Sequence, residues 1–152
     1  EIIKIIRLCR PDIILCNARQ DRHPDHGNAA NLINDASFLS GLVKIKTQIN
    51  GNNQEPYRPN VIYNYLQYND DKPDFIVDIS EFIDQKMEII KSYSSQFYDP
   101  DSNEPETIIS KKEFLDLVLN RSSDLGRFIS VDYAEGFSAY RYLGVNNLFH
   151  LK

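Results

Sequence analysis

The sequence predicts an α/β protein, in which the strands of an open sheet alternate with helices. Residues 11–16 form a short apolar run of the kind found in buried parallel strands. Residues 29–42 then show helical periodicity, and further strand-like and helix-like segments follow. With 152 residues and 41% hydrophobic content, the chain can bury one core. We therefore expect residues 1–152 to form a single domain.

The first half of the chain is expected to supply a helix, a buried strand at residues 11–16 and a second helix. Four apolar residues near the N-terminus fall on one stripe at helical spacing. They are Ile2, Ile5, Ile6 and Cys9. The second helix, at residues 29–42, is expected to end near Gly41. Residues 48–59 are rich in Asn, Gly and Pro and are expected to form a loop.

Two more strands are expected at residues 61–66 and 74–78, joined by a polar turn at residues 69–73. Ser80 is a suitable N-cap for the helix that follows, because apolar residues recur after it at helical spacing. This core-facing set is Phe82, Ile83, Met87, Ile90 and Tyr93. The alternation of strands and helices therefore continues into the second half of the chain.

An acidic loop at residues 99–107 precedes the last predicted helix. Its carboxylates can in principle hold a second cation, but their spacing lacks the glycine and ligand rhythm of a calcium loop, so we favour a structural or subunit-contact role. These residues are Asp99, Asp101, Glu104 and Glu106. Ser110 is a suitable cap for a helix that runs to about Ser122. The residues of this helix that we expect to be buried are Phe114, Leu115, Val118 and Leu119.

Composition excludes several classes of function. A net charge of −5 with scattered lysines and arginines disfavours nucleic-acid binding, which needs a basic surface. No apolar run approaches the roughly 20 residues that a membrane span requires, so no membrane partner is expected. Cys9 and Cys16 form neither a Cys-x-x-Cys pair nor a disulfide framework. We expect both to be buried thiols in a reducing cytoplasm.

Several potentially reactive side chains lie close together in the loop after the first predicted strand. This segment is Asp21-Arg22-His23-Pro24-Asp25-His26-Gly27-Asn28. It holds two of the three histidines of the chain, two carboxylates and an arginine. Loops at the carboxyl ends of strands are where open α/β sheets bind ligands. His23 and His26 are three residues apart with a proline between them, so they can face one small volume without sharing a role. A catalytic zinc site normally takes three protein ligands, so at least one would come from elsewhere.

A simpler interpretation of the same segment is structural. In it, Asp25 or Asn28 only caps the following helix and the histidines are solvated loop residues. His150, the third histidine, follows Phe149 at the end of the sequence and is not expected to bind a metal. The local pattern favours a metal or catalytic site at residues 21–28 but leaves this alternative open.

The segment at residues 21–28 resembles the second signature motif of the LmbE-like (PIG-L) zinc deacetylases, which remove acetyl groups from N-acetylglucosaminyl conjugates. Four other segments resemble the subgroup that deacetylates N-acetylglucosaminyl malate in bacillithiol synthesis, in the order in which that subgroup has them. They are residues 75–80, 95–107, 133–137 and 143–145. The resemblance implies a Rossmann-like LmbE fold, a three-layer α/β/α arrangement with a mostly parallel sheet. It also implies Zn²⁺ as cofactor, a small sugar conjugate as substrate and a homo-oligomer.

The resemblance further implies roles for five residues. His26 corresponds to a zinc ligand, and His23 to the histidine that stabilises the oxyanion or acts as an acid. Asp25 corresponds to the carboxylate that orients His23. Arg22 corresponds to an arginine that meets the substrate, for which the malate carboxylate is a suitable partner. Arg141 matches a recurring arginine that either binds substrate or anchors its local loop.

One family motif has no counterpart in this sequence. The first motif, His-Pro-Asp-Asp, supplies two further zinc ligands and the general-base aspartate in the family, and it does not occur here. We therefore expect the sequence to be the C-terminal portion of a longer zinc-dependent N-deacetylase, without the N-terminal strand that carries this motif. Two alternatives remain: a deacetylase of another N-acetylglucosamine compound, such as a chitobiose-like disaccharide or an inositol conjugate, and a truncated, non-catalytic binding module.

Overall fold

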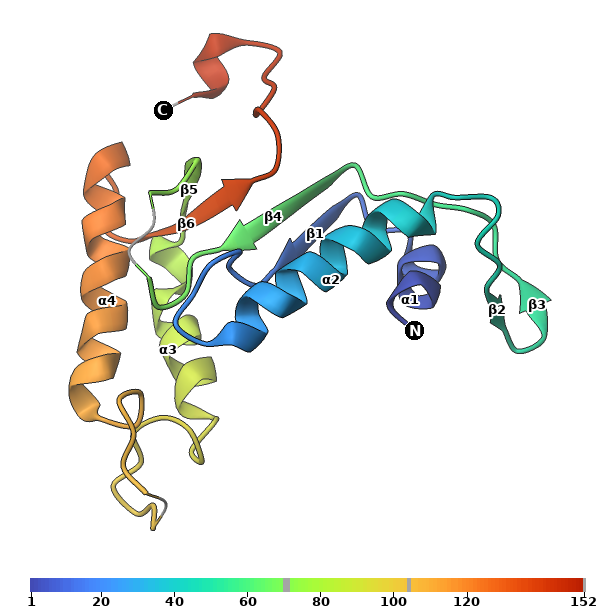
Figure 1. Cartoon of the computed structure of the whole chain (residues 1–152). Coiled ribbons are helices and arrows are strands. Elements are labelled where there is room, and N and C mark those ends of the chain that lie inside the picture. The colour runs from blue at the N-terminus through green and yellow to red at the C-terminus, as the bar shows by residue number, and fades with distance from the viewer. Residues whose placement is uncertain (70–71, 104, 152) are drawn as a thin grey trace. The chain divides into compact units, whose positions relative to one another are not determined.

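The computed structural model describes residues 1–69, 72–103 and 105–151 (Figure 1). Contacts divide the chain into two compact units. The first unit comprises Glu1–Phe75 and Phe137–Leu151, and the second comprises Ile76–Gly136. The elements in chain order are α1 (Ile2–Cys9), β1 (Ile13–Cys16), α2 (Pro24–Ser40), β2 (Gln48–Ile49), β3 (Asn52–Asn53), β4 (Val61–Tyr65), β5 (Phe75–Asp78), η1 (Ser80–Phe82), α3 (Ile83–Lys91), α4 (Lys112–Gly126), η2 (Arg127–Ile129), β6 (Ala134–Ala139) and η3 (Leu148–His150).

The main sheet has the strand order β1-β4-β6-β5. Strands β1 and β4 pair in parallel, with Cys16 opposite Asn64, and α2 lies between them in the chain. This is the crossover that a parallel pair requires. Strand β6 pairs with β4 antiparallel, with Ala139 opposite Tyr63. The predicted α/β class is confirmed.

Strand β1 is found where the apolar run predicts a strand, but its predicted burial is only half correct. Cys16 is 5% exposed, whereas Ile13 and Leu15 are 54% and 58% exposed. Successive side chains of a strand point to opposite faces, so one face of β1 packs and the other stays open. The buried thiol has a raised pKa, because burial disfavours the charged thiolate of Cys16.

Helix α1 also buries a different face from the predicted stripe. Ile6 and Arg7 are each 4% exposed, while Ile5 is 55% exposed. Cys9, predicted to be buried, is exposed on the last turn of the helix. The cause is Arg7, whose guanidinium donates hydrogen bonds to acceptors at the end of α2 and in the segment after it. Helix α1 therefore buries Arg7, a charged residue that helical periodicity alone would place on the solvent-exposed face.

Helix α2 begins at Pro24, five residues before the predicted start, and ends at Ser40 before Gly41. Proline at the first helical position is favourable, because its missing N–H needs no partner there. The N-cap is His23, whose ring accepts a hydrogen bond from the backbone N–H of Asp25. The alternative in which Asp25 or Asn28 caps the helix is therefore wrong.

The strands between α2 and η1 follow the predicted order, with one added hairpin. The predicted loop at residues 48–59 contains the short hairpin β2–β3, whose turn has Gly51 at φ 78°. Strands β4 and β5 occur as predicted, and part of the turn at residues 69–73 lies outside the described residues. The aromatic ring of Phe75 packs against Tyr63 and Phe137, with centroids 4.8 and 5.3 Å apart.

The second unit contains α3 and α4, and both predicted caps are wrong. The Ser80 hydroxyl donates to the Asp78 carboxylate, and a 3₁₀ turn separates Ser80 from α3. Helix α4 starts at Lys112, because the Ser110 hydroxyl accepts from the backbone N–H of Thr107 instead of capping the helix. Both serine hydroxyls bond to groups outside the helices rather than to helix N–H groups, and Ser80 also accepts from the backbone N–H of Tyr133.

The core of the second unit confirms part of the predicted apolar sets. Ile83, Met87 and Leu115 are buried. Phe82 and Tyr93, predicted to face the core, are 58% and 59% exposed. They lie in the 3₁₀ turn before α3 and beyond its end, where the helical period no longer holds. The helix core was therefore predictable and its flanks were not.

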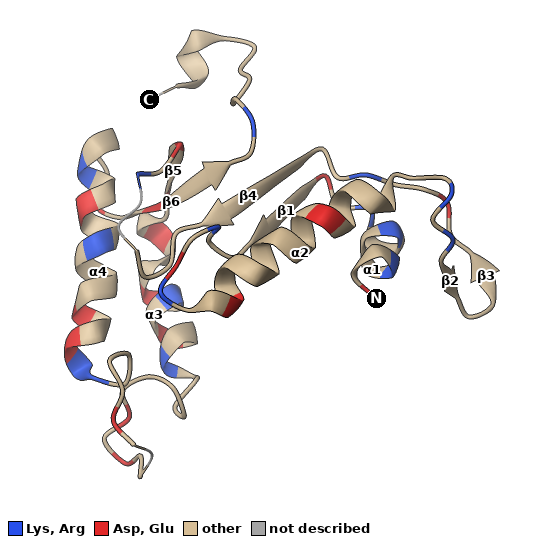
Figure 2. Cartoon of the chain, in the orientation of Figure 1, with Lys and Arg blue, Asp and Glu red and all other residues tan. Residues whose placement is uncertain are grey.

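Charges of both signs are spread over the described chain (Figure 2). Helix α4 carries both signs, and the loop between α3 and α4 carries Asp99 and Asp101. Within the described ranges, no helix combines the length and the apolar character needed to cross a membrane.

Gly126, the last residue of α4, is packed too closely for a side chain. A Cβ at this position would lie 2.6 Å from the Val131 carbonyl oxygen and 2.9 Å from that of Asp132. We expect Gly126→Ala to destabilise the chain by about 1–3 kcal/mol in urea unfolding, because these contacts are with backbone that must move. Gly144→Ala, where a Cβ meets nothing within 4 Å, is the control. Equal stability of the two variants would contradict the close packing.

Candidate active site

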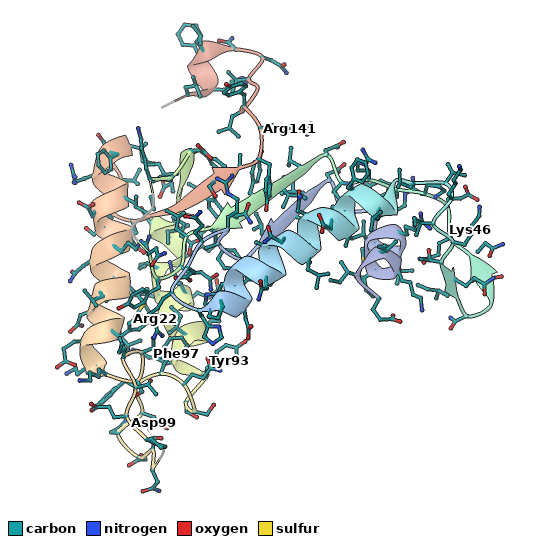
Figure 3. All side chains as sticks on the ribbon, in the orientation of Figure 1. Arg22, Lys46, Tyr93, Phe97, Asp99 and Arg141 are labelled. Atoms are coloured by element: carbon teal, nitrogen blue, oxygen red, sulfur yellow. The ribbon has the colours of Figure 1, made fainter. Side chains whose placement is uncertain are left out.

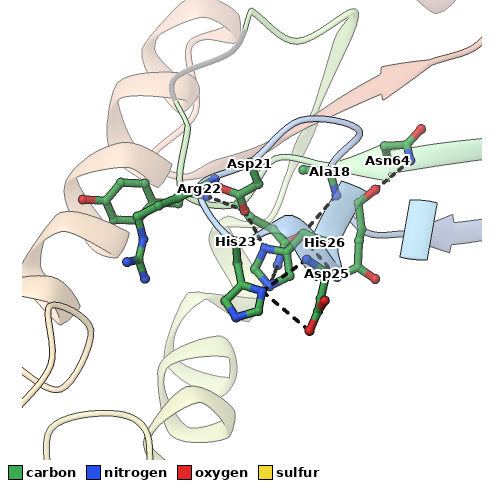
Figure 4. Close-up of polar contacts among 10 residues, drawn as sticks. Ala18, Asp21, Arg22, His23, Asp25, His26 and Asn64 are labelled. Atoms are coloured by element: carbon green, nitrogen blue, oxygen red, sulfur yellow. Dashed lines mark hydrogen bonds and ion pairs between the residues drawn. The ribbon is translucent and has the colours of Figure 1, made fainter. Parts of the chain in front are cut away.

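The candidate site lies on the loop between β1 and α2, at the carboxyl end of β1 (Figure 4). Because β1 and β4 are parallel, the segment after β4 reaches the same edge of the sheet. The loop brings His23 and His26 together, with ring centroids 5.4 Å apart. His23 is the N-cap of α2 and His26 lies in its first turn. The structure thus places both predicted histidines at one sheet edge.

His26 is held by Asp21, a residue of the motif for which the sequence suggested no role. Nδ1 of His26 lies 2.7 Å from Oδ2 of Asp21, whose side chain is fully buried. The Asp21 carboxylate also accepts hydrogen bonds from the backbone N–H groups of Arg22, at 2.6 Å, and Tyr68, at 3.3 Å. Burial alone would raise the pKa of Asp21, but these hydrogen bonds together outweigh it and hold the pKa below its ordinary value. Asp21 is therefore a fixed anionic acceptor for His26.

His23 is more exposed and is held by the start of α2. Its Nδ1 accepts from the backbone N–H of Asp25 at 3.3 Å, and 54% of its side chain is exposed. The Asp25 carboxylate lies 3.8 Å from the same nitrogen, which is beyond hydrogen-bond distance. Because Nδ1 accepts, the neutral ring carries its proton on Nε2. This outward nitrogen is a potential proton donor.

Gln67, just beyond β4, completes the surroundings of His26. Its Oε1 accepts from the backbone N–H of Ala18 at 3.1 Å and from Nδ2 of Asn17 at 3.2 Å. Its Nε2 lies 3.4 Å from Nε2 of His26. The sequence carries no local signal for this contact, because 41 residues separate Gln67 from His26.

The two predicted substrate-binding arginines lie in different parts of the first unit (Figure 3). The Arg22 guanidinium lies over the Tyr68 ring, 5.0 Å from its centroid and next to the histidines. Arg141 donates to the carbonyl oxygen of Asn60, which precedes β4. It lines a cavity of about 550 Å³ beside the later turns of α2. This contact fits the alternative in which Arg141 anchors its local loop.

The donor chemistry of His26 fits one position of a metal site. The hydrogen bond to Asp21 uses Nδ1 and leaves Nε2 as the nitrogen for a metal, as in carboxylate–histidine–zinc arrangements. Within the described part of the chain, no three His, Cys, Asp or Glu residues form a group that can hold a metal ion. The described carboxylates of the acidic loop, Asp99, Asp101 and Glu106, belong to no such group, and Glu104 lies outside the described residues.

Known proteins share similarity with this chain, whereas no protein-family model matches it. A diacetylchitobiose deacetylase of Thermococcus kodakarensis is 29% identical over 100 residues, which are 64% of this chain and 36% of that protein. The conserved protein TT1542 of Thermus thermophilus has a TM-score of 0.78 and 29% identity, covering 95% of this chain and 59% of its own. The N,N'-diacetylchitobiose deacetylase of Pyrococcus horikoshii, solved with its inhibitor MPG, has a TM-score of 0.66 and 25% identity, covering 90% and 48%.

A fourth likeness concerns the fold alone. GalB of Pseudomonas putida KT2440, a 4-carboxy-2-hydroxymuconate hydratase, has a TM-score of 0.69 at 17% identity. The chain spans between about a third and three fifths of the lengths of these proteins. The similarities to the two deacetylases and to TT1542 point to the LmbE-like (PIG-L) deacetylase superfamily. Two of these similar proteins bear the name of one particular enzyme, diacetylchitobiose deacetylase.

Proposed function

We propose that this chain supplies part of the active site of a metal-dependent N-deacetylase that hydrolyses the acetamide of an N-acetylglucosaminyl conjugate. The observation that carries the proposal is the pair His23 and His26 at the carboxyl end of β1, with the buried Asp21 on His26. Similarity to two diacetylchitobiose deacetylases supports this chemistry. Fold alone would not, because the GalB hydratase has a similar fold.

His26 would hold the metal, Zn²⁺ in this proposal, through Nε2, together with ligands from outside the described residues. When bound, the metal supplies a Lewis acid that polarises the acetamide carbonyl and makes water acidic enough to react near neutral pH. Asp21 keeps the His26 ring in the orientation that its 2.7 Å hydrogen bond defines. The role of this half of the site is to present a fixed imidazole nitrogen.

His23 would provide the proton chemistry. If the ring carries a proton on both nitrogens, its Nε2–H can donate to the negative charge that develops on the carbonyl oxygen and can then transfer that proton to the leaving amine, which leaves His23 neutral. The proton of the attacking water would go to a base from outside the described residues. Asp25 lies 3.8 Å from Nδ1, where a small side-chain rotation brings its carboxylate onto that nitrogen once it carries a proton. The products are acetate and the free glucosamine conjugate.

Two substrates are candidates within this class. Residues 75–80, 95–107, 133–137 and 143–145 resemble the subgroup that acts on N-acetylglucosaminyl malate, which supports that conjugate and a place in bacillithiol synthesis. The two similar deacetylases are named for diacetylchitobiose, which supports a disaccharide. The malate conjugate carries carboxylates and the disaccharide is uncharged. A cationic side chain at the site should therefore favour binding of the malate conjugate over the disaccharide.

Arg22 is the side chain that tests this choice. If it meets the malate carboxylate, Arg22→Gln should raise KM for the malate conjugate by roughly 10–100-fold, the cost of losing a hydrogen bond to a charged group. KM for diacetylchitobiose should stay the same. Arg10→Gln is a matched control, because Arg10 also lies over a tyrosine ring, that of Tyr57. Equal effects on both substrates would remove the carboxylate-binding role of Arg22.

Acetate release by the gene product that contains this sequence tests the proposed reaction. It would be measured with N-acetylglucosaminyl malate and with diacetylchitobiose, after zinc loading and after chelation. We expect zinc-dependent acetate release from at least one of the two substrates. A zinc-loaded, folded protein that releases acetate from neither would contradict the deacetylase proposal and favour the binding-module alternative.

A further inference from the structure

The surroundings of His26 determine which of its ring nitrogens carries the proton. Each side-chain amide has one oxygen that accepts and one nitrogen that donates. The backbone N–H of Ala18 can only donate, and it points at Oε1 of Gln67, 3.1 Å away. Nε2 of Gln67 must therefore be the atom that faces His26, at 3.4 Å from Nε2 of the ring. This amide nitrogen is a donor, so the ring nitrogen that it faces must accept.

The contact of Asp21 with Nδ1, on the other side of the His26 ring, independently indicates the same tautomer. Asp21 accepts from the backbone N–H groups of Arg22 and Tyr68, and its side chain is fully buried beside them. A carboxylate in this setting has only acceptor atoms to offer His26, so Nδ1 must carry the proton across the 2.7 Å contact. Two residues from different segments thus require one form of His26, protonated on Nδ1 with a lone pair on Nε2.

We propose that Asp21 and Gln67 are positioning residues that hold His26 as the Nδ1–H tautomer, and that Gln67 is a placeholder which occupies Nε2 until a divalent metal replaces it. The metal part of this inference rests on the proposed function, whereas the tautomer follows from the contacts alone. Gln67 remains attached to Ala18 and Asn17 through Oε1 when its nitrogen leaves the ring. Binding of a metal would then cost Gln67 one long hydrogen bond, while its Oε1 contacts would still hold it to the loop.

The two residues have different effects in this scheme. Asp21 holds the ring in both the metal-free and the metal-bound state, so its loss weakens metal binding. Gln67 contacts Nε2 only in the metal-free state and competes with the metal, so its loss does not weaken metal binding. A purely structural network would make both substitutions harmful to metal binding.

The tautomer is tested on the metal-free gene product that contains this sequence, by the ¹⁵N chemical shifts of its histidine rings at neutral pH in the presence of EDTA. We expect Nε2 of His26 to give the shift of an unprotonated nitrogen and Nδ1 that of a protonated one. Asp21→Ala should produce a mixture of tautomers, and Asp21→Asn, which keeps a carbonyl acceptor, should restore the Nδ1–H form in part. Asp25→Asn, which alters the neighbour of His23, should leave the His26 shifts unchanged.

A protonated Nε2 in the wild-type chain would overturn the tautomer assignment, and this spectrum requires no variant to fold. Because no metal or substrate is present, the result is separate from whether the protein is a deacetylase. The placeholder role is tested by zinc titration of the gene product that contains this sequence. We expect Asp21→Ala to weaken zinc binding roughly 10–100-fold and Gln67→Leu to bind at least as tightly as wild type. Equal weakening by both substitutions would overturn the placeholder role.

Discussion

His26→Ala is expected to abolish metal binding and acetate release together, whereas His23→Ala is expected to keep the metal and lose turnover. The difference follows from the two environments. His26 is half-buried, and its Nδ1 is hydrogen-bonded to the buried carboxylate of Asp21, so its Nε2 is the nitrogen left for a metal. His23 is exposed, and its Nε2 can donate a proton. Loss of a proton donor of this kind lowers kcat by roughly 10²–10⁴-fold. Loss of a residue that hydrogen-bonds to a metal ligand weakens metal binding by roughly 10–100-fold. Loss of the ligand His26 itself should weaken zinc binding by more than this.

The measurements are bound zinc per protein and kcat, made on each variant of the gene product that contains this sequence. His150→Ala is the control, because it removes the remaining histidine of the chain from η3, outside the loop between β1 and α2. It should change neither quantity. If His23→Ala and His26→Ala lose zinc to the same extent, the division of roles between the two histidines is wrong.

Arg7→Leu is expected to be the most destabilising substitution in the first unit. Arg7 is 4% exposed, and its guanidinium donates four hydrogen bonds of 2.8–2.9 Å to the last residue of α2 and to the segment that follows it. The acceptors are the backbone carbonyls of Ser40, Leu42 and Ile45 and the hydroxyl of Thr47. Removing the donor breaks four hydrogen bonds to a charged group, each worth about 1.5–3 kcal/mol, although the Ser40 and Leu42 carbonyls keep the backbone N–H groups of Tyr57 and Ile45 as partners. The positive charge also lies at the negative end of the α2 dipole.

We therefore expect Arg7→Leu to lower the free energy of unfolding by about 3–5 kcal/mol, measured by urea denaturation. Arg7→Lys should recover only a small part of this, because an ammonium group cannot reproduce the planar set of donors. Lys4→Ala on the same helix is the control, since Lys4 forms only an exposed ion pair with Glu1, which is worth little. A loss below about 1 kcal/mol in Arg7→Leu would show that these hydrogen bonds do not hold the segment after α2.

Local sequence patterns predicted the elements that depend on local periodicity. The apolar run before Asn17 predicted β1, and the alternating segments near Val61 and Phe75 predicted β4 and β5. The position of the histidine motif after β1 then predicted the sheet edge on which the site lies. These predictions succeeded because the spacing of apolar residues along a short segment indicates whether it forms a strand or a helix.

Features that depend on distant contacts were not predictable in this way. Arg7 and Gln67 look like solvated polar residues in the sequence, and each finds its partners more than 30 residues away. Strand β6 was missed because its small residues show no apolar alternation, although Ala134 is fully buried. Asp21 stands in the motif itself, and only its burial shows that it serves His26.

A zinc-edge anomalous diffraction map of the zinc-loaded gene product that contains this sequence would show whether His26 binds the metal. We expect a peak at the bond distance of about 2.0–2.1 Å from Nε2 of His26, with Asp21 still hydrogen-bonded to Nδ1 and Nε2 of Gln67 moved away. A peak remote from His26, or zinc bound to Nδ1 with Asp21 displaced, would contradict the claim that this loop is half of a metal-dependent deacetylase site.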